Sequence, residues 1–210
     1  MAAVLPVPRS ADDDFGEPTS EERHALATTI AALESAGALT PGEVDAGTMW
    51  DAAQHYFPGE PVGFLEALAS LAALHDHGFE PRRITFIPVH VEYDGELLAA
   101  ITASILTSLG HEVGEPDVLV TLPRDDWEGE AVVTFPIEDR RESVTCHYRV
   151  KYPPPDLCTA LAAFARADDP RELVCADPGY QMLLVAAIRP DTLTELNRRF
   201  PVGYAMFGPP

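Results

Sequence analysis

Residues 130–152, EAVVTFPIEDRRESVTCHYRVKY, contain the clearest secondary-structure signal of the chain. Within this stretch, residues 143–152 alternate apolar and polar side chains, which is typical of a strand with one buried face. Residues 130–137 are rich in branched apolar side chains, and the charged segment 138–142 separates the two runs. We therefore expect a β-hairpin with strands at 130–137 and 143–152.

Further strands and helices are expected on both sides of this hairpin. The other strands are expected at 84–93, 117–122, 173–176, 180–188 and 202–207. Helices are expected at 20–36, from Thr40 to about residue 56, at 61–75, at 96–109, from Asp156 onward and at 191–200. Because helices cluster before residue 80 and hairpins follow, the sequence predicts an α+β fold. Its N-terminal helical segment is expected to pack on a mainly antiparallel sheet with interspersed helices.

Two local signals sharpen this prediction. Thr19 and Glu22 have the spacing of a capping box at the start of the first helix. Pro88 lies in the expected strand 84–93 and has no backbone N–H to donate to a neighbouring strand. We therefore expect this strand to lie at the edge of its sheet or to contain a bulge.

The chain is expected to divide into three parts. Residues 1–17 are acidic and rich in proline, which is typical of a flexible arm. Residues 18–80 form the helical subdomain, and residues 81–210 form the α+β sheet domain. A length of 210 residues suits one domain or two small ones, and we expect the last two parts to form one compact unit.

The charge of the chain limits its partners. It has 34 acidic and 14 basic residues, which give a net charge of -20. Such a field repels phosphate backbones and anionic membrane surfaces, so we expect no binding to nucleic acid or membrane. The acidic excess lies before residue 151, whereas residues 151–210 are nearly neutral. The same charge either keeps the protein soluble or attracts a basic protein partner.

Composition also bears on where the protein works. The three cysteines contain no CxxC pair, which argues against a disulfide scaffold or a zinc ribbon and favours a reducing cytoplasm. The first 15 residues lack the apolar run of a signal peptide. Lys151 is the sole lysine, a bias that suggests a GC-rich bacterial genome. We expect a cytoplasmic protein that is a monomer when free.

No catalytic signature is recognisable in the sequence. The GxSxG, P-loop, GxGxxG and HExxH motifs are absent from it. Cys146 and His147 are neighbours on a strand, so they face opposite sides and do not form a nucleophile and base pair. His75 and His77 are two residues apart at the end of a helix, a spacing that directs them away from each other. We expect no catalytic residues, no cofactor and no metal site.

The best candidate for a functional site is the acidic turn between two expected strands. It combines a large aromatic side chain with four carboxylates: Asp125, Asp126, Trp127, Glu128 and Glu130. Tryptophan is enriched at interface hot spots, and carboxylates suit a basic partner. The alternative is that Trp127 folds back onto the sheet and serves only packing.

In its small size, acidity and lack of motifs, the chain resembles the immunity proteins that bacteria make against their own toxins. This resemblance implies a non-catalytic protein that covers the active site of a basic toxin, with Trp127 as the anchor. The alternative is a small-molecule-binding domain, or an enzyme without local motifs, whose pocket lies between the helical part and the sheet. Its candidate lining residues are His55, Tyr56, His90 and Tyr93.

Overall fold

The computed structural model describes residues 16–77, 81–123 and 126–210, so most of the expected arm at 1–17 lies outside the described residues. The fold class is α+β, as predicted, and the strands are divided between two antiparallel sheets. The α-helices are α1 (Ser20–Ala36), α2 (Ala46–Tyr56), α3 (Phe64–Ser70), α4 (Gly95–Ser108), α5 (Leu157–Ala162) and α6 (Leu193–Arg199). The strands are β1 (Ile84–Pro88), β2 (Asp117–Thr121), β3 (Glu128–Ile137), β4 (Arg140–Arg149), β5 (Glu172–Ala176), β6 (Met182–Ile188) and β7 (Phe207–Gly208).

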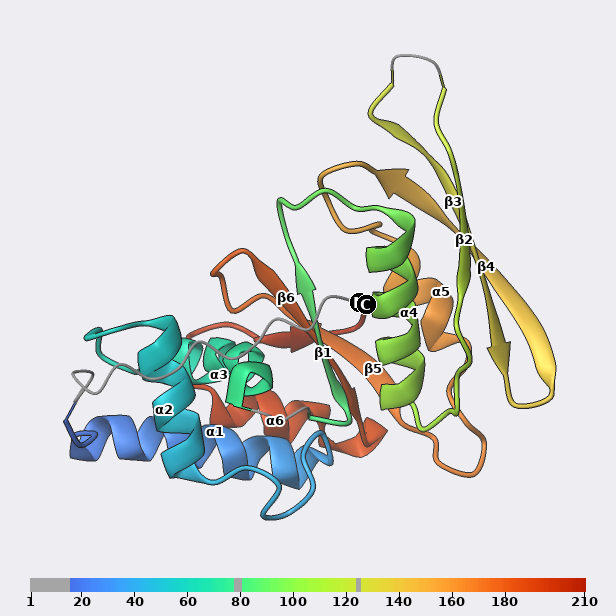
Figure 1. The fold of residues 1–210 in the computed structure, drawn as a ribbon. Coiled ribbons are helices and arrows are strands. Elements are labelled where there is room, and N and C mark those ends of the chain that lie inside the picture. Colours follow the sequence, from blue (N-terminus) through green and yellow to red (C-terminus); the bar gives the residue numbers. More distant parts are fainter. Residues whose placement is uncertain (1–15, 78–80, 124–125) are drawn as a thin grey trace.

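The elements form four successive layers. Helices α1, α2, α3 and α6 cover one face of a four-stranded sheet with the order β1-β6-β5-β7. Helices α4 and α5 cover its other face and separate it from a three-stranded sheet with the order β2-β3-β4. Figure 1 shows the three-stranded sheet as the outermost layer on that side of the molecule.

Alternation along β6 explains why the four-stranded sheet lies in the middle. Leu184, Ala186 and Ile188 pack in the core of the helical layer. Val185 and Ala187 point the other way, into the core around α4. Successive side chains of a strand face opposite sides of its sheet, and all five are apolar and buried. A strand with two apolar faces requires cover on both sides, and the two helical layers provide it.

The three-stranded sheet is covered on only one face. Ala131, Val133 and Phe135 of β3 are buried in the core with α4 and α5. On the opposite face, Leu119 is 67% exposed, and Thr145 is exposed as well. The alternating pattern that predicts the hairpin therefore describes a sheet with an inner and a solvent-facing side.

Helix α1 begins and ends as predicted. The Thr19 hydroxyl accepts a hydrogen bond from the Glu22 backbone N–H at 3.3 Å, and the Glu22 carboxylate accepts one from the Thr19 N–H at 2.8 Å. Gly37 ends the helix with a left-handed φ of 83°. The second Glu22 oxygen accepts from the Val62 N–H at 3.1 Å, so the same carboxylate holds the segment before α3 against α1.

Removing this cap should weaken the helical layer. A Thr19→Ala substitution is expected to lower the free energy of unfolding by about 1 kcal/mol, because the Glu22 N–H loses its acceptor. Chemical denaturation followed by circular dichroism measures this loss, with Thr28→Ala in the middle of α1 as the control for side-chain truncation. A Thr19→Ala protein as stable as wild type would contradict the capping role of Thr19.

The second and third helices differ from the prediction. Helix α2 begins at Ala46 rather than near Thr40, because Gly42 adopts a left-handed φ of 76° and Asp45 provides the N-terminal cap. Residues 61–75 are not one α-helix: α3 begins at Phe64, and a 3-10 helix continues from Leu71 to His77.

The expectation for Pro88 is confirmed, since β1 is an edge strand of the four-stranded sheet and Pro88 is its last residue. Pro88 pairs with Met182 of β6. Among the described residues, no helix combines the length and apolar character needed to cross a membrane.

Candidate functional site

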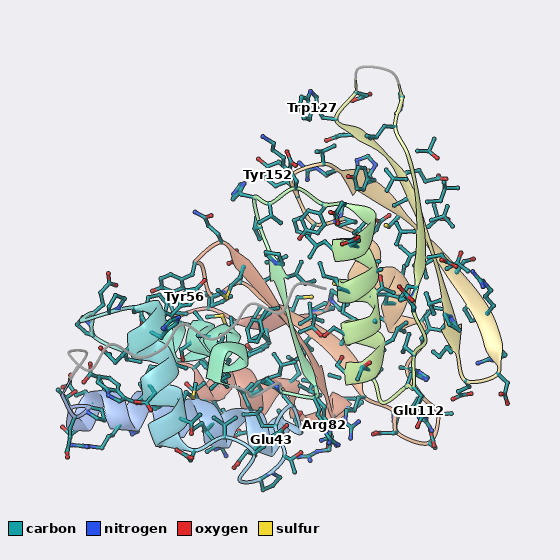
Figure 2. The ribbon with its side chains drawn as sticks, viewed as in Figure 1. Glu43, Tyr56, Arg82, Glu112, Trp127 and Tyr152 are labelled. Carbon is teal, nitrogen blue, oxygen red and sulfur yellow. The ribbon has the colours of Figure 1, made fainter. Side chains whose placement is uncertain are left out.

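Trp127 lies at the end of the three-stranded sheet, beyond the cover of α4. It lies in a bend, one residue before β3 begins at Glu128. Helix α4 begins at Gly95, which packs against Val118 further along the sheet. Trp127 is therefore 67% exposed, and Figure 2 shows it at the tip of the molecule. The alternative that Trp127 folds back onto the sheet is wrong.

The backbone around Trp127 is held by hydrogen bonds on both sides. The carboxylate of Asp126 accepts from the backbone N–H groups of Trp127 at 2.8 Å and Glu128 at 3.3 Å. The Trp127 carbonyl accepts from the Val150 N–H at 3.1 Å. Asp126 thus shapes the turn, and the tryptophan is presented from a fixed backbone.

Of the other predicted site residues, Glu128 is already paired within the chain. Its carboxylate lies 3.3 Å from His147 Nε2 and 3.4 Å from Arg149 Nε. Glu130 is exposed and faces His147 in the strand register. Asp125 lies outside the described residues. The structure therefore brings Asp126, Trp127, Glu128 and Glu130 to one end of the sheet, with the two glutamates on its solvent-facing side.

Four further residues belong to this surface, and the sequence places none of them there. Lys151 Nζ lies 6.0 Å from the centre of the Trp127 ring, and the guanidinium of Arg149 lies 4.6 Å from the Tyr152 ring centre. His90 packs edge-on against Tyr152, with ring centres 5.0 Å apart. Alternation along β4 predicts that Arg149 lies on the same face as Glu128. It does not predict the contact between Tyr152 and His90.

These contacts change the electrostatic character of the predicted site. The sequence suggests a surface of carboxylates, whereas Arg149 and Lys151 lie among them. We define the tip surface as Asp126, Trp127, Glu128, Glu130, Arg149, Lys151, Tyr152 and His90. Acidic and basic side chains there surround the exposed rings of Trp127 and Tyr152. Protein interfaces typically combine aromatic side chains at the centre with a polar rim.

The four residues named for the alternative pocket are not gathered into one site. Tyr56 is exposed on the helical layer and is far from Tyr152 in Figure 2, whereas His90 contacts Tyr152. Tyr93 is buried, and its hydroxyl donates to the Pro88 carbonyl. Burial raises the pKa of Tyr93 well above its usual value, so this phenol is a structural donor.

Cys146 is not an activated nucleophile. Burial, helped by the charges of Asp156 and Glu130, raises the pKa of the Cys146 thiol to about 11. Cys158 and Cys175 are also free thiols, joined by a side-chain hydrogen bond between α5 and β5. Within residues 16–77, 81–123 and 126–210, no group of three or more His, Cys, Asp or Glu side chains is arranged to hold a metal ion.

A cavity of about 350 Å³ opens at the other end of the three-stranded sheet. It lies between the β3–β4 turn, His111, which comes three residues after the end of α4, and the segment that follows α5. Its polar side chains come from His111, Glu138, Arg140, Glu142, Arg166 and Asp168. No local motif links these residues, so the sequence gives no sign of the cavity.

Comparison with known proteins identified no relative of this chain. No protein-family model matches the chain, no curated protein matches it in sequence, and no solved structure matches it in fold.

Proposed function

We propose that this chain is a non-catalytic binding protein that neutralises a basic protein partner by covering its working surface, as bacterial immunity proteins do with toxins. The observation that supports it best is the 67% exposure of Trp127 on a hydrogen-bonded turn. An exposed tryptophan is costly in water and becomes a strong anchor when a partner buries it. Its fixed backbone also reduces the entropy lost on binding.

The charge of the protein supports the same proposal, both while the partner approaches and once it is in contact. At long range, the net charge of -20 attracts a basic partner and speeds the encounter. At contact, the carboxylates of Asp126, Glu128 and Glu130 would pair with arginine or lysine side chains of the partner, and Glu128 would give up its contacts with His147 and Arg149. Arg149 and Lys151 require a matching acidic group on the partner, which adds specificity for one orientation. The charge also disfavours self-association, so we propose a cytoplasmic monomer as the free state.

The proposal predicts that changing Trp127 and Asp126 together abolishes partner capture. The tagged protein is incubated with lysate of the source cells, washed at low and high salt, and the retained proteins are identified by mass spectrometry. A basic protein is expected on the wild type at low salt and to be depleted at high salt. The Trp127→Ala, Asp126→Arg variant should bind it at least about thirtyfold more weakly, because an anchor and a favourable charge are lost.

The matched control is Tyr204→Ala, which removes another exposed aromatic side chain away from the tip surface. This variant should capture the partner as well as the wild type does. Equal retention by the double variant and the wild type would discard the tip surface as the binding site. If neither protein captures a basic partner, the inhibitor function itself fails.

The second candidate is the small-molecule domain or motif-free enzyme with a pocket between the helical part and the sheet. It has weaker support, because its candidate residues Tyr56 and His90 lie in separate parts of the molecule.

A further inference from the structure

His111 at the 350 Å³ cavity has an unusual hydrogen-bonding state. Its side chain is only 7% exposed, and its Nε2 lies 2.6 Å from the Phe164 carbonyl oxygen. A carbonyl oxygen only accepts, so Nε2 carries the hydrogen. In the neutral ring, Nδ1 is then an acceptor. This nitrogen is buried and has no hydrogen-bond partner.

The charged group facing Nδ1 is the carboxylate of Glu138, which is also an acceptor. Glu138 Oε1 lies 3.8 Å from His111 Nδ1, beyond hydrogen-bond distance. A buried acceptor without a donor is energetically costly, so such groups are normally satisfied. Two acceptors at this separation are suited to one donor group with several N–H bonds placed between them.

The cations already present at the cavity are occupied by other carboxylates. Arg166 donates two hydrogen bonds to Asp168, at 2.9 and 2.6 Å, and one to the Gly110 carbonyl at 3.3 Å. It approaches Glu138 only to 3.6 Å. Arg140 lies 3.5 Å from Glu142. With three carboxylates against two guanidinium groups, and a chain of net charge -20, the cavity favours an added cation over an anion.

We propose that this cavity binds a primary ammonium group, whose N–H bonds are shared by His111 Nδ1 and the carboxylate of Glu138. The ammonium belongs to a small free amine or to a lysine side chain of another polypeptide. A volume of about 350 Å³ is suitable for such a group and its alkyl chain. This inference does not depend on the tip surface, which lies at the other end of β3.

The test uses two isomeric cations of the same charge. The wild-type protein, with isotope-labelled histidine, is titrated at neutral pH with n-butylammonium chloride or tetramethylammonium chloride. NMR follows the His111 ring nitrogens. n-Butylammonium is expected to shift the Nδ1 resonance in a saturable way, because it donates hydrogen bonds. Tetramethylammonium has no N–H bond and should leave that resonance unchanged.

Two variants locate the effect. Glu138→Gln keeps the shape of the side chain but removes its charge, and should weaken n-butylammonium binding about tenfold. Glu21→Gln makes the same change in the first turn of α1, and should leave the affinity unchanged. Equal shifts with both cations, an unsaturable shift, or no effect of Glu138→Gln would each overturn the proposal.

A third ligand distinguishes the two sources of the ammonium group. If Nα-acetyl-lysine methylamide binds at least as tightly as n-butylammonium, the cavity accepts a lysine side chain of a polypeptide. If only n-butylammonium binds, the ligand is a free amine. Failure of both would refute the ammonium site but leave capture by the tip surface unaffected, so the two proposals are judged separately.

Discussion

A Phe135→Ala substitution is expected to lower the free energy of unfolding by about 3–5 kcal/mol, which is enough to unfold a marginally stable domain. Phe135 is fully buried between the three-stranded sheet and the α4–α5 layer. Its ring packs edge-on against Phe164, with ring centres 5.2 Å apart. Truncation therefore leaves a void between rigid elements that do not collapse to fill it. Chemical denaturation measures the loss.

The control for this prediction is Leu119→Ala on the solvent-facing side of the same sheet. Leu119 is largely exposed, so its truncation should change the free energy of unfolding by less than about 0.5 kcal/mol. A similar stability for the two variants would mean that the inner and outer faces of this sheet are wrongly assigned.

A Gly129→Ala substitution is expected to destabilise the protein by about 1–3 kcal/mol and to disrupt the tip surface. A Cβ atom at Gly129 would lie 2.2 Å from the Thr121 carbonyl oxygen, so the backbone of β2 or β3 must shift. That shift also moves Trp127, two residues away. Denaturation measures the stability, and hydrogen exchange of the Val150 N–H reports the bond to the Trp127 carbonyl.

The matched control here is Gly208→Ala, because an added Cβ at Gly208 meets no atom within 4 Å. It should be close to wild type in both measurements. Wild-type stability and unchanged Val150 exchange in Gly129→Ala would show that β2 and β3 are not in such close contact.

Local sequence signals predict most of the elements because their causes are local. The capping box at Thr19 and Glu22, the left-handed Gly37 and the alternation along β4 each depend on residues a few positions apart. The start of α2 is mispredicted for a related reason. Thr40 and Pro41 form a good helix start in isolation, but Gly42 leaves the helical conformation and its N–H donates to the side chain of Glu34.

Alternation reveals which residues share a face, but it does not reveal which strands pair. The division into two sheets therefore does not follow from the sequence. The exposure of Trp127 has the same origin, since the residue lies just before β3 and only the position of α4 in the fold leaves it uncovered. The cavity of about 350 Å³ joins His111, Glu138 and Arg166 from three distant segments, and no short motif encodes that meeting.

The strand order also has a consequence for how the chain is made. Within the four-stranded sheet, β1 pairs with β6 across a sequence separation of about 100 residues, with Ile84 opposite Ala186. Contacts between distant residues slow folding, because a long loop must close before they form. During synthesis, the helical layer must wait for β6 to complete the sheet beneath it, whereas the β3–β4 hairpin can form as soon as it emerges. The apolar faces of the first helices thus stay uncovered by the sheet for most of the synthesis of the chain.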